Sequence, residues 1–183
     1  MKRLLILACA FASLSLGGCA LVAPPYQASI ENAKTLKRAG APQMNVGQVD
    51  SDASIKAISL RGSKMKPSLG NYGQYIAEAI TSELKLASLY EPMSSTVISG
   101  KLLTQDINIT SFMTGSSDIS VTFMVSRDDS KVFKKIYTQT HEFESSFLGA
   151  IAIPNGQLAY KDLVQKLLKQ VFTDPEFVAA VKG

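Results

Sequence analysis

The chain has 183 residues, of which 46% are hydrophobic and 19% charged, and its formal net charge is +4. This length and composition predict one globular domain with enough chain to bury a core. The small net charge, without a stripe of Lys and Arg, argues against nucleic-acid binding. One histidine and two cysteines leave little material for a metal site.

The N-terminal residues have the pattern of an exported, acylated protein. Met1-Lys2-Arg3 is a basic start, an apolar run covers 4–16, and Leu16-Gly17-Gly18-Cys19 follows. These features predict a signal peptide over 1–18, with an apolar core shorter than the roughly 20 residues of a membrane span. Leu16–Cys19 resembles the bacterial lipobox. That resemblance implies cleavage between Gly18 and Cys19 and a diacylglycerol on the Cys19 sulfur.

Cysteine usage agrees with acylation. Cys9 would leave with the signal peptide, so residues 19–183 contain Cys19 alone and cannot form an internal disulfide. A lone thiol in an exported protein requires an explanation, and a lipid anchor supplies one. The residue after Cys19 is Ala20 rather than aspartate, which resembles the sorting pattern of outer-membrane lipoproteins. We therefore expect a lipid-anchored protein of the outer membrane whose domain faces the periplasm.

A tether and a single domain over 29–183 are expected after the anchor. Residues 20–28 carry no charge and contain Pro24-Pro25, which predicts an extended tether from Cys19. Ser29 is a favourable N-cap for a helix that ends near Arg38.

The middle of the chain predicts strands, a loop and a helix. The β-prone stretches are 44–49 and 55–60, and segment 61–68, which contains glycine and proline, predicts a loop. Its cations Arg61, Lys64 and Lys66 are expected to be solvated. Asn71 is an N-cap for a helix whose apolar residues repeat at helical spacing: Tyr72, Ile76, Ala79, Ile80, Leu84 and Ala87.

The remaining chain predicts three strands and two helices. Strands are expected from 96 to 103 or beyond, over 119–125 and over 132–143, with a polar hairpin connection at 127–131. A helix is expected from near Asn155, and Asp174-Pro175-Glu176 begins a short terminal helix. Strands grouped between helices predict an α+β fold, with a mostly antiparallel sheet of about four or five strands packed on one face by two long helices.

Residues 147–154 form an unusual apolar stretch without a charged or hydrogen-bonding side chain. Connections between strands and helices are usually polar because they lie on the surface. One interpretation is a loop tucked under the helix start, or an extra short strand. The other is an apolar contact loop for lipid, a lipidic ligand or a partner protein, formed by Phe147, Leu148, Ile151 and Ile153.

Catalytic patterns are not evident. His141 is expected on the opposite strand face from Glu142, and Asp128-Asp129 suits a turn. No serine lies in a nucleophile elbow, and glycine-rich phosphate loops are absent. We therefore expect a non-enzyme without catalytic residues, cofactor or metal.

The segments Ile58–Gly62 and Ile98–Leu102 flank the capped helix, and 143–154 leads into the last long helix. With the lipobox, this layout is similar to that of the YajG-like envelope lipoproteins. The resemblance transfers no catalytic residue. We expect a non-catalytic binding or structural module that contacts an envelope protein or a lipid-derived ligand. An accessory lipoprotein subunit of an envelope lipid or polysaccharide transport system is the alternative, and an envelope hydrolase is the least favoured.

Overall fold

A computed structural model describes residues 21–68 and 70–183. The expected signal peptide, Gly18, Cys19 and Ala20 lie outside the described residues. The elements in chain order are β1 (Leu21–Val22), α2 (Ile30–Arg38), β2 (Asn45–Ser51), β3 (Ile58–Leu60), β4 (Ser63–Lys66), α3 (Tyr72–Leu86), β5 (Thr96–Asn108), β6 (Thr114–Arg127), β7 (Ser130–Glu144), α4 (Gly149–Thr173) and α5 (Pro175–Lys182).

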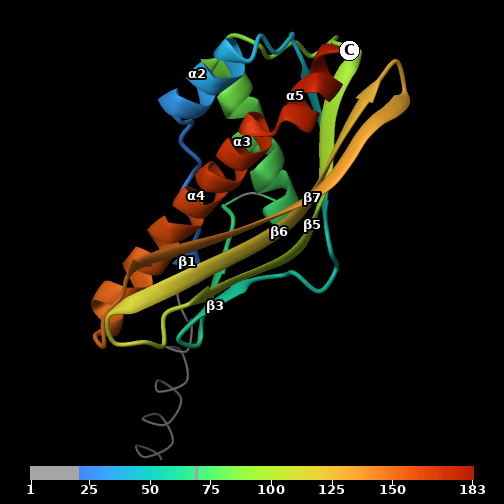
Figure 1. Cartoon of the computed structure of the whole chain (residues 1–183). Coiled ribbons are helices and arrows are strands. Elements are labelled where there is room, and N and C mark those ends of the chain that lie inside the picture. The colour runs from blue at the N-terminus through green and yellow to red at the C-terminus, as the bar shows by residue number, and fades with distance from the viewer. Residues whose placement is uncertain (1–20, 69) are drawn as a thin grey trace, which may run out of the picture.

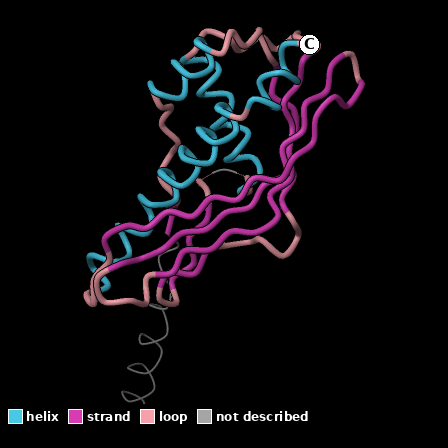
Figure 2. The backbone as a smooth tube through the Cα atoms, in the orientation of Figure 1, coloured by secondary structure: helices cyan, strands magenta, loops and turns pink. Residues whose placement is uncertain are grey.

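Four strands form the main sheet, in the order β2-β5-β6-β7. Strands β5, β6 and β7 are antiparallel neighbours, whereas β2 runs parallel to β5 at one edge. The described helices lie on one side of this sheet, and α4 packs along β7 and β6 (Figure 1). The backbone trace shows the same two layers (Figure 2). The predicted α+β class is confirmed.

The β6–β7 hairpin forms where the sequence predicts it. Its turn contains Asp128 and Asp129, whose φ angles of 48° and 63° are in the left-handed region that two-residue hairpin turns require. Alternate side chains of β6 are buried under the helices: Ile119, Val121, Phe123 and Val125. Both strands are longer than predicted, because pairing with a neighbour continues into polar sequence at their ends.

The predicted helices cover the buried face of the sheet. In α3 the predicted stripe from Tyr72 to Ala87 is buried, and the Gln74 N–H donates to Asn71 Oδ1 at 3.0 Å. Helix α2 follows the Ser29 N-cap, and α5 follows the Asp174 N-cap. The capping residues therefore predicted these helix starts correctly.

A second sheet, in the order β1-β4-β3, corrects the loop predicted over 61–68. Strand β4 is antiparallel to β3 and parallel to β1. The breaker residue Gly62, with a φ of 86°, makes the tight turn between β3 and β4 rather than a long loop. The strand expected over 55–60 is correspondingly reduced to Ile58–Leu60.

Helix α4 begins at Gly149, not near Asn155, so residues 149–154 are helical. The loop and the short strand predicted there are both wrong. Pro154 lies inside the helix, where its missing N–H removes one backbone hydrogen bond. The early turns nevertheless bury an apolar stripe that continues into the predicted helix: Ala152, Gly156, Ala159 and Tyr160. Burial of this stripe stabilises the helix on both sides of the proline.

Residues 21–28, which the sequence predicts to belong to an extended tether, pack against the domain. Ala23 is buried, the Tyr75 hydroxyl donates to the Pro24 carbonyl at 3.0 Å, and Gln165 Nε2 donates to the Gln27 carbonyl at 2.6 Å. The folded unit therefore includes residues 21–28 and does not begin at 29. This contact shortens the tether that the sequence predicted.

Gly73 allows α3 to lie directly on β2. A Cβ at this position would be 2.2 Å from the Val49 carbonyl oxygen. We expect Gly73→Ala to lower the free energy of unfolding by about 3 kcal/mol through overpacking, more than the roughly 1 kcal/mol gained in helix propensity. Chemical denaturation measures the change. Gly149→Ala is the matched control, because its Cβ would have no neighbour closer than 3.9 Å. An equal loss in the control would contradict the close-approach argument.

Candidate functional site

An exposed apolar surface lies at the end of the molecule where β5 leads into β6 and α4 begins. We call it the apolar tip. It comprises five side chains with exposed fractions of 47% to 79%: Phe112, Met113, Phe147, Leu148 and Ile151. The rings of Phe112 and Phe147 stack, with centroids 5.6 Å apart and 15° between their planes. Exposed apolar clusters that are contiguous in this way are typical of interaction sites.

Arg61 ties together the two chain segments that form the tip. From the β3–β4 turn, its guanidinium donates to the carbonyls of Ile109 at 3.0 Å, Ser146 at 2.7 Å and Phe147 at 2.6 Å. The planar guanidinium group carries several N–H donors in a fixed arrangement, so it can bind separated acceptors at the same time. Arg61 is exposed, as expected, but its guanidinium is also held by three backbone carbonyls. The tip is one fixed surface rather than two independent loops.

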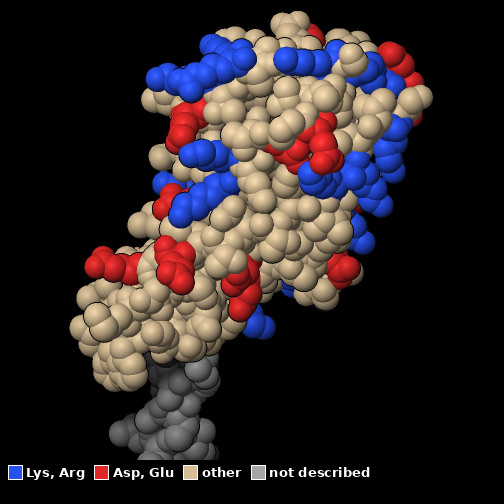
Figure 3. Space-filling model, in the orientation of Figure 1, with Lys and Arg blue, Asp and Glu red and all other residues tan. Residues whose placement is uncertain are grey.

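The tip lies in a part of the molecule with little charge. The chain has no charged residue over 19–30, 107–117 and 145–160, and the last two stretches carry the five tip side chains. In the space-filling view the lower end of the molecule shows almost no charged side chain on the face toward the viewer, while Lys and Arg gather toward the opposite end (Figure 3). Acidic side chains border the uncharged end in the same view. An apolar partner could therefore approach this end without desolvating many charges.

The first described residues lie at the same end as the tip. Strand β1 runs parallel to β4, with Leu21 opposite Met65. Because β4 begins two residues after Arg61, Leu21 is the end of β1 nearer the tip. Gln157 of α4 donates to the Val22 carbonyl at 2.8 Å, which ties β1 to the first half of that helix. Figure 1 places β1 and β3 at this end of the molecule.

The structure places three of the four predicted contact residues on the tip. Phe147, Leu148 and Ile151 are exposed, whereas Ile153 is partly buried against the core. Sequence reasoning missed Phe112 and Met113, which lie in the short connection between β5 and β6. The available signal was that 107–117, like 147–154, carries no charge, although it contains Asn, Thr and Ser side chains.

A buried polar centre holds the chain that leads away from β1. Glu83 of α3 is fully buried and accepts hydrogen bonds from the Tyr26 hydroxyl at 2.5 Å, the Asn32 amide at 3.0 Å and the Ser29 N–H at 3.1 Å. Asn32 also donates to the Gln165 carbonyl of α4 at 3.1 Å. Burial raises the pKa of Glu83 above its usual value, although its three donors oppose that shift.

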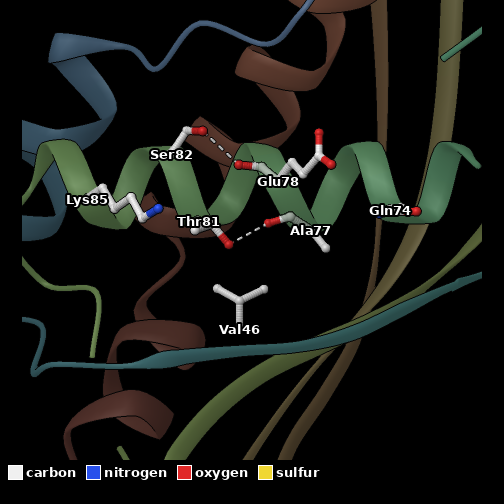
Figure 4. A pocket seen from close by; sticks show the side chains of 7 residues that line it. All are labelled: Val46, Gln74, Ala77, Glu78, Thr81, Ser82 and Lys85. Atoms are coloured by element: carbon white, nitrogen blue, oxygen red, sulfur yellow. Dashed lines mark hydrogen bonds between the residues drawn. The ribbon is translucent and has the colours of Figure 1, made fainter. Parts of the chain in front are cut away.

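A groove between α3 and the edge strand β2 is a second concave surface, of about 330 Å³. Figure 4 shows Val46 of β2 facing Ala77 and Thr81 of α3 across it. The Thr81 hydroxyl donates to the Ala77 carbonyl at 2.9 Å, and that of Ser82 donates to the Glu78 carbonyl at 2.8 Å. Both hydroxyls are therefore engaged by their own helix, and the groove offers little convergent chemistry.

His141 is not arranged for catalysis. Its Nδ1 lies 2.7 Å from Lys166 Nζ, and burial together with the Lys166 charge lowers the pKa of the ring. In this contact the neutral ring accepts a hydrogen bond from the Lys166 ammonium group. Glu142 lies on the opposite face of β7, as the strand period predicts. The pair therefore joins β7 to α4.

A charged cluster at the start of α5 has a structural explanation. Asp174 accepts hydrogen bonds from the Tyr137 hydroxyl at 2.6 Å and from the Glu176 N–H at 2.9 Å, and Lys135 lies 2.8 Å away. Burial raises the pKa of Asp174, but the hydrogen bonds from Lys135, Tyr137 and Glu176 outweigh it and lower the pKa to about 2. The cluster caps α5 and attaches it to β7.

The described residues contain neither a metal-binding cluster nor a membrane-spanning helix. No group of three or more His, Cys, Asp or Glu side chains is placed to hold a metal ion across 21–68 and 70–183. Over the same residues, no helix is both long and apolar enough to cross a membrane.

Comparison with known proteins supports the fold alone. No family model and no curated protein matches the chain. The structure is similar to protein XCC0632 from Xanthomonas campestris, of family DUF330, with a TM-score of 0.59 over 84% of this chain and 93% of that one, at 9% identity. At that identity the likeness extends to the arrangement of helices and strands and no further.

Two weaker likenesses involve other bacterial proteins. The hypothetical protein CT253 from Chlamydia trachomatis gives a TM-score of 0.47 at 13% identity over 76% of this chain and 99% of that one. A minor lipoprotein from Acinetobacter baumannii gives 0.42 at 12% identity over 76% and 92%. Scores in this range carry no argument about function.

Proposed function

We propose that the protein is a lipid-anchored lipoprotein of the outer membrane, whose domain faces the periplasm and acts as a non-catalytic binding module. Its partner is apolar, either an envelope protein or lipid-derived material, and it is bound at the tip. The observation that carries this proposal is the apolar tip itself. Two segments far apart in the sequence are clamped by Arg61 into one exposed apolar surface, at the end where the described chain begins.

The sequence before Leu21 supports the anchor. Leu16-Gly17-Gly18-Cys19 resembles a lipobox. The three acyl chains that a fully processed lipobox cysteine carries exceed the two signals needed for stable membrane attachment.

The anchor is tested by Cys19→Ser in the full chain. We expect the unaltered protein to fractionate with membranes and to be released by detergent, because its attachment is by lipid. The Cys19→Ser protein should fold, since it retains the whole domain, and should leave the membrane fraction. Cys9→Ser is the matched control and should remain membrane-bound. Retention of Cys19→Ser in washed membranes would contradict the proposed anchor.

A further inference from the structure

We propose that the apolar tip inserts into the surface of the lipid bilayer that carries the anchor, and so fixes the orientation of the domain. This inference rests on the proposed function, because it assumes acylation at Cys19. Its first support is the short length of free chain. Residues 21–28 are docked on the domain, so only Ala20 separates Cys19 from Leu21, a span of two residue steps. Two residue steps of extended chain reach at most about 7 Å.

The direction of β1 fixes which end of the domain faces the membrane. Leu21 is the end of β1 nearer the tip, because β1 is parallel to β4 and pairs with it at Met65. Val22 accepts a hydrogen bond from Gln157 of α4. Gln157 lies eight residues after Gly149, the first residue of that helix. At 1.5 Å per residue, the start of α4 lies about 12 Å further toward the tip. A chain anchored near Leu21 therefore holds the tip at the bilayer.

The chemistry of the surface fits a bilayer boundary. Phe112, Met113, Phe147, Leu148 and Ile151 supply an apolar contact of the kind that penetrates about 5–10 Å into the headgroup region. Lys64 and Lys66 are exposed on β4, the strand beside β1, where they would meet anionic headgroups. Glu144, at the end of β7, is exposed and limits how deeply this end can enter.

Two exposed methionines provide a matched test. Met113 is on the tip, and Met93 precedes β5 at the other end of the sheet, with exposed fractions of 79% and 89%. A strand of 13 residues separates the two ends, which is on the order of 40 Å. Because the Cys19 thiol is occupied in acylated protein, Met113→Cys and Met93→Cys each create one reactive site for an environment-sensitive fluorophore.

The labelled, acylated proteins are placed on vesicles of phosphatidylethanolamine and phosphatidylglycerol that contain brominated acyl chains. We expect several-fold stronger quenching and a blue shift at position 113, with no change at 93. Equal, weak quenching at both positions in protein that floats with the vesicles would overturn tip insertion while leaving the anchor intact.

Failure of the anchor gives a different result. If mass spectrometry finds no acyl chain on Cys19, the proposed function fails, and the labelled Cys19→Ser protein is then added to the same vesicles. Quenching at 113 in that protein would still support insertion, and its absence would overturn it. Protection of position 113 from a soluble thiol reagent in cells but not on vesicles would show that a protein covers the tip, and would also overturn the lipid contact.

Discussion

Replacing Glu83 by alanine is expected to lower the free energy of unfolding by about 4 kcal/mol, because it removes the shared acceptor of a buried hydrogen-bonded group and leaves the donors behind. The Tyr26 hydroxyl and the Ser29 N–H would each lose their acceptor, and the Asn32 amide would keep only its bond to the Gln165 carbonyl. A buried donor without a partner costs about 1–3 kcal/mol. Urea denaturation followed by circular dichroism measures the loss.

The position of the three donors adds a local consequence. Tyr26 belongs to the docked residues 21–28, Ser29 follows them and Asn32 lies in the first turn of α2, so we expect Glu83→Ala to release this segment before the domain unfolds. Amide hydrogen exchange should then be faster over 21–32 than in β6. Glu78→Ala is the matched control, since Glu78 is exposed on the same helix and its side chain contributes no bond to this centre. Unchanged exchange over 21–32 in Glu83→Ala would contradict the assigned role.

The same carboxyl predicts a dependence of stability on pH. Burial raises the pKa of Glu83, so the folded protein holds this proton more tightly than the unfolded chain does. The stabilisation that Glu83 contributes through its raised pKa is fully present below the usual glutamate pKa. It is lost as the pH rises through the pKa of Glu83 in the folded protein. Glu83→Gln removes the titration. We expect the free energy of unfolding of the unaltered protein, relative to that of Glu83→Gln, to fall as the pH rises above the usual glutamate pKa, and a rise would contradict the direction of the shift.

Local periodicity was sufficient for the elements that make the main sheet and its helices. The stripe of α3 and the alternation of β6 each reflect one buried face, which a sequence displays directly. Strand β4 could not be predicted in this way, because Ser63–Lys66 owes its conformation to backbone bonds with Leu21–Val22 and Ile58–Leu60. Pro154 likewise resembles a helix boundary, and only the buried stripe around it shows that α4 continues.

The candidate site was predictable in part for a related reason. The apolar stretch 147–154 was evident as a run without charge, and three of its four predicted contact residues are exposed. Phe112 joins them because of where β5 and β6 turn, which depends on strand pairing. Arg61 gave no signal, since its acceptors are backbone carbonyls as far as 86 residues away in the chain.

Replacing Arg61 by methionine is expected to loosen the tip while most of the domain stays folded. Methionine keeps the length of the side chain but removes every donor to the carbonyls of Ile109, Ser146 and Phe147. Hydrogen bonds from a charged donor contribute about 1.5–3 kcal/mol each, and water can replace part of this at an exposed site. We expect the free energy of unfolding to fall by about 2–3 kcal/mol, which denaturation measures.

Hydrogen exchange identifies the mechanism, because the loss should be local. Exchange should accelerate over 109–113 and 146–152, which the guanidinium joins, and should change little in α3. Arg61→Lys should restore only part of the protection, since one ammonium group cannot reach three separated carbonyls. Arg38→Met, at an exposed arginine at the end of α2, should leave the tip unchanged.

The membrane contact provides an independent readout of the same substitution. If the tip must be a single surface to enter the bilayer, Arg61→Met should reduce quenching of a label at Met113 while the acylated protein still floats with vesicles. This outcome separates the clamp from the anchor, because flotation depends on Cys19 and quenching depends on the tip. Full quenching in Arg61→Met, with accelerated exchange at 109–113, would show that the apolar side chains enter lipid without being held together.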